Sequence, residues 1–120
     1  ETIAVLPVGY SDGYPPEAVI GGGHVWLGRA RCPFVGEMSS NHCMVRVPAD
    51  ATVAAGDFAI MIATGNEPSF FGAAPEEGGD PWAGPPSAEM VAHWADISIY
   101  RVHIGLNPKL PRAFEGARRR

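Results

Sequence analysis

Short apolar runs recur along the chain and are separated by turn-forming residues. These runs cover residues 2–8, 24–27, 30–35 and 58–63, and residues 42–47 alternate between polar and apolar side chains. Such patterns are typical of β-strands, and the run at 58–63, apolar throughout, is predicted as a central strand buried on both faces. Gly28-Arg29 suits the tight turn of a hairpin. Residues 97–104 are predicted as a final β run.

One segment has the pattern of a helix. Ser87 offers an N-cap, Glu89 follows early, and apolar residues recur on one face, so a short helix is expected at residues 88–95.

The predicted fold is mainly β: a small, closed or nearly closed, antiparallel, Greek-key-like β-barrel of about six strands with that one helix. The expected core residues are Val5, Leu6, Val25, Leu27, Val35, Val45, Ile60, Ile62, Trp94 and Ile99.

Composition narrows the class of protein. A chain of 120 residues with 15 glycines and 12 prolines fits one domain of short strands and many turns. Its net charge of −4 argues against a nucleic-acid partner, because phosphate binding needs a basic face. The sequence has neither an apolar run long enough to span a membrane nor a basic-then-apolar leader, so we expect no membrane partner and a cytoplasmic location.

The cysteines and histidines do not predict a metal site. Cys32 and Cys43 lie in separate runs without a Cys-x-x-Cys pair and are expected to be buried free thiols. The four histidines are scattered along the chain, at His24, His42, His93 and His103. We therefore expect no metal.

The segment from Val8 to Pro15 presents a tyrosine directly after the first apolar run. Gly9, Gly13 and Asp12 are turn residues, so Tyr10 is expected at the rim of a rigid element. The segment alone favours a ring that caps the β core with its hydroxyl in water. The alternative is a general acid or base, which needs a nearby positive charge or hydrogen bond to lower the phenol pKa from about 10. Nothing in the segment itself supplies that charge.

Two segments that begin with glycine are predicted to be loops. Gly36 to Asn41 interrupts the β pattern and is predicted as a loop or bulge whose backbone N–H groups can bind a ligand. Gly65 to Pro86 is a long excursion with three aromatic residues, Phe70, Phe71 and Trp82. It is interpreted either as a contact surface or as a satellite cluster that folds back.

Several motifs together resemble the C-terminal domain of alanine racemase. They are the Val8 to Pro15 block, Pro33 to Gly36 leading into Met38 to Met44, Gly56-Asp57, Ser87 to Ala95, and Leu110-Pro111-Arg112. The resemblance covers nearly the whole chain, residues 1–120. It implies that a (β/α)₈ barrel holding pyridoxal 5′-phosphate precedes this domain in sequence and is absent from this chain. It also implies a homodimer in which the β domain of one subunit lends a catalytic tyrosine, here Tyr10, to the barrel of the other.

The resemblance also implies a reaction. Pyridoxal phosphate acidifies the α-hydrogen of an amino acid, and racemisation needs a base on each face, one the cofactor lysine and the other the tyrosine. The loop from Ser39 to His42 resembles the stretch that donates a backbone N–H to the substrate carboxylate, which makes Ser40 and Asn41 substrate-binding candidates. The family usually has Met-Asp at these two positions, so the charge and packing of that corner differ, and the substrate is alanine, serine or another small amino acid.

Lysine content limits what the chain does alone. Lys109 is the only lysine and lies between prolines in an extended segment, which is typical of a surface cation. A cofactor lysine needs a phosphate-binding site around it. The isolated chain is therefore predicted to be catalytically incomplete, and no cofactor-binding residue is assigned.

Three functional hypotheses follow. The first is the tyrosine-bearing domain of an amino-acid racemase that serves D-alanine biosynthesis. The second is a decarboxylase of the same barrel class, whose family uses a cysteine in a Cys-Glu/Asp-Ser-like motif; Cys32 precedes Pro33 and Cys43 precedes Met44, so that signature is absent. The third is a non-catalytic β-barrel module for assembly, which the Ser40-Asn41 departure keeps open.

Overall fold

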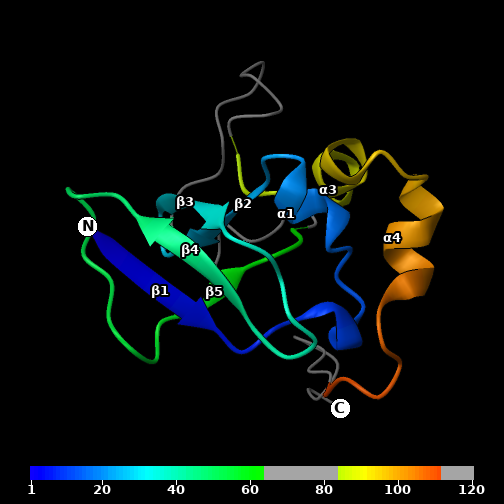
Figure 1. Cartoon of the computed structure of the whole chain (residues 1–120), viewed down its shortest axis with the longest axis horizontal. Coiled ribbons are helices and arrows are strands. Elements are labelled where there is room, and N and C mark those ends of the chain that lie inside the picture. Colours follow the sequence, from blue (N-terminus) through cyan, green and yellow to red (C-terminus); the bar gives the residue numbers. More distant parts are fainter. Residues whose placement is uncertain (64–83, 112–120) are drawn as a thin grey trace, which may run out of the picture.

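Five antiparallel strands form one sheet that curls into a half-barrel, seen in a computed structural model that describes residues 1–63 and 84–111 (Figure 1). The strands lie in the order β1 (Thr2–Leu6), β4 (Cys43–Val47), β3 (Ala30–Val35), β2 (His24–Leu27) and β5 (Ala59–Ile60). The predicted mainly β, antiparallel fold is confirmed. Most of the Gly65 to Pro86 loop lies outside the described residues.

The central hairpin forms as the sequence predicts. β2 and β3 pair through Leu27 and Ala30, so that Gly28-Arg29 is a two-residue turn. Gly28 has φ +60°, a backbone conformation that glycine adopts without steric strain. Val25 and Cys32 are paired opposite each other and are fully buried. The hairpin therefore supplies the middle of the core.

Strand β4 shows the alternation that its sequence predicts. Cys43, Val45 and Val47 are buried, whereas Arg46 is exposed. Its neighbour β1 lies at one end of the sheet and buries Leu6, but Val5 is 64% exposed. The prediction of Val5 as a core residue was wrong, because successive side chains on a strand point to opposite faces and only the face of Leu6 is covered.

The predicted central strand at residues 58–63 was also wrong. Only Ala59 and Ile60 form a strand, β5, which pairs with β2 alone among the described residues and ends the sheet. Phe58 is 74% exposed. The run is apolar throughout, but the strand is short, only one of its edges is paired among the described residues, and of its two residues Ile60 alone is buried.

Within residues 1–63 and 84–111, three helices and one 3₁₀ turn accompany the sheet, with α1 and α3 beside one another at one end (Figure 1). Helix α3 (Ala88–Ala95) has the predicted bounds, and the Ser87 side chain accepts a hydrogen bond from Met90 N at 3.2 Å as its N-cap. Helix α1 (Glu17–Ile20) and the 3₁₀ turn η1 (Tyr10–Asp12) were not predicted.

The predicted β run at residues 97–104 was wrong, because residues Ile99–Gly105 form helix α4. Ser98 caps it by accepting from Tyr100 N at 3.2 Å. Val102 is buried, while Tyr100 and Ile104, one turn apart, are exposed. The β-branched residues of this segment favour a strand, but the serine cap fits a helix, as does the three-residue spacing of half-buried Ile99 and buried Val102.

The rest of the core agrees closely with the sequence. Among the predicted core residues, Leu6, Val25, Leu27, Val45 and Ile60 are buried and Val35, Ile62, Trp94 and Ile99 are half-buried. Both cysteines are buried and free, as predicted. Burial raises the pKa of the Cys43 thiol to about 11 and also raises that of Cys32. No helix in residues 1–63 and 84–111 is long and apolar enough to cross a membrane.

Candidate active site

The turn after β1 displays Tyr10 at the surface. Residues Tyr10–Asp12 form η1, in which the Asp12 carboxylate accepts a hydrogen bond from Gly9 N at 2.9 Å. Gly13, at φ +99°, ends the turn by donating its N–H to Tyr10 O at 3.0 Å. The Tyr10 side chain is 52% exposed. The turn is thus internally bonded, and its phenol projects outward.

The loop from Ser39 to Asn41 holds one side of this turn. Tyr10 N donates to Ser39 O at 3.1 Å, and Ser11 N donates to Ser40 O at 3.0 Å. Ser11 Oγ also donates to Ser40 O and to Asn41 Oδ1, the latter at 3.2 Å. A side chain at Gly9 would overlap the backbone of Ser39 and Ser40, so only glycine permits this approach.

Within that loop, the Ser39 hydroxyl accepts hydrogen bonds from two backbone N–H groups. Ser39 Oγ accepts from Asn41 N at 3.3 Å and from His42 N at 3.1 Å, and it lies 2.9 Å from His42 Nδ1. The Ser40 N–H has no partner among the described residues. The sequence predicted a loop here with backbone N–H groups free to bind a ligand, and Ser40 carries such a group beside the Tyr10 turn.

The chain segment after α4 holds the opposite side of the turn. Asn107 N donates to Asp12 O at 2.9 Å, and Asn107 Nδ2 donates to Ser11 O at 3.2 Å. A side chain at Gly13 would overlap the backbone of Gly105 and Leu106, so the two segments are in direct backbone contact. Sequence patterns do not predict this contact, because it joins residues 96 positions apart.

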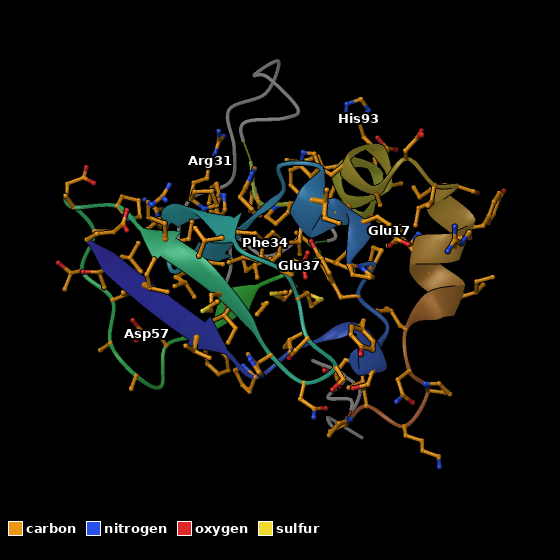
Figure 2. All side chains as sticks on the ribbon, viewed as in Figure 1. Glu17, Arg31, Phe34, Glu37, Asp57 and His93 are labelled. Atoms are coloured by element: carbon orange, nitrogen blue, oxygen red, sulfur yellow. The ribbon has the colours of Figure 1, made fainter. Side chains whose placement is uncertain are left out.

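A cleft of about 430 Å³ lies next to the turn, between α1 and α4. Tyr10 lines it together with Glu17 and Arg101, and Figure 2 shows Glu17 between the two helices. The Val8 to Pro15 segment carries no positive charge of its own, whereas the fold brings Arg101 to the same cleft. The residue escaped prediction because the segment that carries it was taken for a strand.

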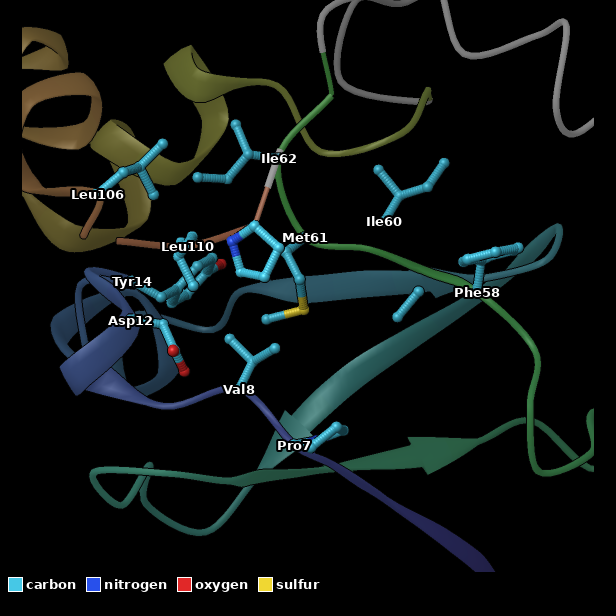
Figure 3. A pocket seen from close by; sticks show the side chains of 12 residues that line it. Pro7, Val8, Asp12, Tyr14, Phe58, Ile60, Met61, Ile62, Leu106 and Leu110 are labelled. Atoms are coloured by element: carbon cyan, nitrogen blue, oxygen red, sulfur yellow. The ribbon is translucent and has the colours of Figure 1, made fainter. Parts of the chain in front are cut away.

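A second, mostly apolar cavity of about 680 Å³ lies under the turn (Figure 3). Val8, Met61 and Leu110 line it, and the Tyr14 ring reaches both cavities. Tyr14 packs against Phe34 with ring centroids 5.7 Å apart, and its buried hydroxyl has no hydrogen-bond partner in the described part of the chain. Burial, followed by the charge of Cys43, raises the Tyr14 pKa above its usual value. Tyr14 is thus a packing residue, in contrast to the exposed Tyr10.

The sole lysine lines neither of the two cavities described above. Lys109 is exposed in the segment after α4, as predicted, and its backbone N–H donates to Asn107 Oδ1 at 2.9 Å. No group of histidines, cysteines and carboxylates able to hold a metal ion occurs in the regions that the structure covers. The chemically equipped part of the described chain is therefore the Tyr10 turn with its cleft and the neighbouring loop.

Comparison with known proteins identifies a family for nearly the whole chain. The family described as alanine racemase, C-terminal domain, matches residues 1–114. The alanine racemase of Symbiobacterium thermophilum is 34% identical over 116 residues, which are 97% of this chain and 26% of that protein. The chain thus spans about a quarter of the length of the curated relatives that it matches over most of its length.

Solved structures share the fold. The alanine racemase of Streptomyces coelicolor A3(2) matches with a TM-score of 0.72 at 20% identity, over 95% of this chain and 25% of that one. The alanine racemase of Bartonella henselae, solved with covalently bound pyridoxal phosphate, matches with a TM-score of 0.69 at 20% identity, over 93% and 27% of the two chains.

Proposed function

Because this chain belongs to the family of alanine racemase C-terminal domains, we propose that it is the C-terminal part of a racemase for alanine or another small amino acid, with Tyr10 as one of the two catalytic bases. The barrel that holds pyridoxal phosphate would precede it in the complete protein, which would be a homodimer. Alone, the chain would be inactive.

The observation that carries the proposal is the way in which Tyr10 is presented. A ring that merely caps the core would be packed, as the Tyr14 ring is, whereas the Tyr10 side chain is half-exposed on a turn fixed by hydrogen bonds from two sides. The same cleft is lined by Arg101 and Glu17, one side chain of each charge. Rigid backbone and an accessible hydroxyl are what a proton-transfer group requires.

Exposed apolar side chains support a neighbouring domain over this site. Tyr100 and Ile104 on the outer side of α4 are 75% and 79% exposed. Leu106, which follows this helix, is also exposed, and so is Tyr10, which lines the same cleft as Ile104. Apolar side chains of this size in one region mark contact surfaces. We assign this region to the contact with the barrel of the partner subunit.

In the proposed mechanism the residues of this chain act on the substrate. Pyridoxal phosphate, when bound in the complete enzyme, withdraws electrons and so acidifies the substrate α-hydrogen. The Tyr10 hydroxyl then takes or returns the proton at the α-carbon on one face. The Ser40 N–H, which has no partner in the described parts of the chain, donates to the substrate carboxylate, and Asn41 fixes the loop through its contact with Ser11. The donors in this loop fit a carboxylate, because they carry hydrogens and no negative charge.

The test is Tyr10→Phe in the complete protein. The ring remains, so folding should change little, while racemisation should fall by roughly 10²-fold or more, the usual scale of a general acid–base contribution. Deuterium incorporation from solvent into each enantiomer should show that only the face served by the tyrosine loses its exchange.

Tyr14→Phe is the matched control, since it removes a buried hydroxyl that has no hydrogen-bond partner among the described residues, and it should leave the rate within about twofold. Equal rates for the parent and Tyr10→Phe, with proton transfer confirmed as the slow step, would refute the catalytic role and favour a non-catalytic assembly module.

A further inference from the structure

Asn107 uses all of its polar groups in hydrogen bonds at the Tyr10 turn. Its backbone N–H and Nδ2 donate to the carbonyls of Asp12 and Ser11, at 2.9 and 3.2 Å. Its Oδ1 accepts from Lys109 N at 2.9 Å, and its backbone oxygen accepts from Leu110 N at 3.1 Å. The side-chain amide is therefore held in one orientation, with its oxygen fixed by its own segment and its nitrogen directed at the turn.

The turn is held on its other side by bonds of the opposite polarity. The N–H groups of Tyr10 and Ser11 donate to the loop carbonyls of Ser39 and Ser40, whereas the carbonyls of Ser11 and Asp12 accept from Asn107. The backbone on both sides of the tyrosine Cα therefore has a fixed direction. Of these anchors to the segment after α4, the Nδ2 bond to Ser11 is the one that depends on a side chain.

We propose that Asn107 is a positioning residue that sets the direction in which the Tyr10 phenol enters the active site. This inference rests on the proposed function of Tyr10. An amide is required at position 107 because Nδ2 must donate to the Ser11 carbonyl; a carboxylate of the same shape has no hydrogen to donate, and its charge repels the carbonyl oxygen. A small displacement of a catalytic group from its productive geometry lowers the rate even though the group is still present.

The test is Asn107→Asp in the complete protein, with Asn107→Ala as a second variant in case the added charge prevents folding. Each should lower kcat by roughly 10-fold or more with little change in KM. The loss should fall on exchange of the α-proton at the tyrosine face, while exchange at the other face persists.

The decisive measurement combines these variants with Tyr10→Phe. If Asn107 acts through the phenol, Asn107→Asp or Asn107→Ala should cause no further loss of kcat when the phenol is already absent. A merely structural role predicts the same fold-loss in both backgrounds. Equal losses in the two backgrounds, or a full rate for both single variants, would overturn the inference.

Ser98→Ala is the matched control for stability. It removes the N-cap of α4, which leads into the same segment, without a contact to the Tyr10 turn. It should lower the thermal midpoint but keep kcat within about twofold. The proposed function fails separately, if Tyr10→Phe alone retains the parent rate.

Discussion

His24 is a histidine buried in the core. It is 8% exposed, and its Nε2 has no partner in the described regions. The ring meets Trp94 edge-on, with centroids 4.8 Å apart, and so joins β2 to α3. Burial, followed by the charge of Arg31, lowers the His24 pKa to about 4. The folded protein therefore holds this residue neutral.

This pKa predicts a pH dependence of stability. The His24 pKa of about 4 in the folded protein is below the usual 6.5, so the unfolded chain binds more protons below pH 6.5. The free energy of unfolding should therefore fall as the pH is lowered from 6.5 to 4. We expect a loss of about 3 kcal/mol over that range, and none attributable to His24 above pH 7. Urea unfolding of the 120-residue chain at a series of pH values measures it. His24→Phe keeps an aromatic ring and should flatten the profile; parallel profiles for the two proteins would contradict the prediction.

At the residue scale, the sequence predicted the displayed tyrosine but not its surroundings. Tyr10, Asp12 and the flanking glycines form a local turn, and local turns follow from residue type. Arg101 and Asn107 reach the same place only through tertiary packing, with nothing in their own neighbourhood to reveal it. The roles of Tyr10, Ser40 and Asn41 stay predictions until the variants are measured.

Helix α3 is an element that local signals predict well, and its cap gives a direct test. Ser87→Ala removes the acceptor for Met90 N and should lower the free energy of unfolding by about 1 kcal/mol. Ser87→Asp keeps an acceptor at the cap and should stay within about 0.5 kcal/mol of the parent. Denaturant unfolding of the three proteins measures the difference, and an equal loss in Ala and Asp variants would show that the cap is not responsible.

Helix α4 and strand β5 are the elements that sequence patterns predicted wrongly. Both contain apolar, β-branched residues whose exposure depends on what covers them, and neither alternation nor run length encodes this. Phe58, Tyr100 and Ile104 are large, apolar and exposed in this chain. An element that will face another domain carries the composition of a core, so its pattern alone suggests burial inside its own fold.

At the scale of the whole molecule, the single lysine makes the division of labour testable. In the complete protein, Lys109→Arg should keep racemase activity within about twofold, because Lys109 is exposed and only its backbone N–H contacts Asn107. When pyridoxal phosphate is added to the isolated chain, its absorbance should show no saturable change that depends on Lys109. The isolated parent chain and its Lys109→Arg variant should therefore give the same spectra. Loss of cofactor attachment in the complete Lys109→Arg protein would place the cofactor lysine in this domain and refute the division.

The anchors of the Tyr10 turn also determine when during synthesis the site takes shape. Of the three residues Ser11 leaves the ribosome first, its partner Ser40 follows 29 residues later, and its partner Asn107 follows 96 residues later. A growing chain can therefore form the turn and dock it on the Ser39 to Asn41 loop well before the other side is held. Contacts between distant residues form late, since a long loop must close first. The Tyr10 turn is therefore held from both sides only when almost the whole domain has been made.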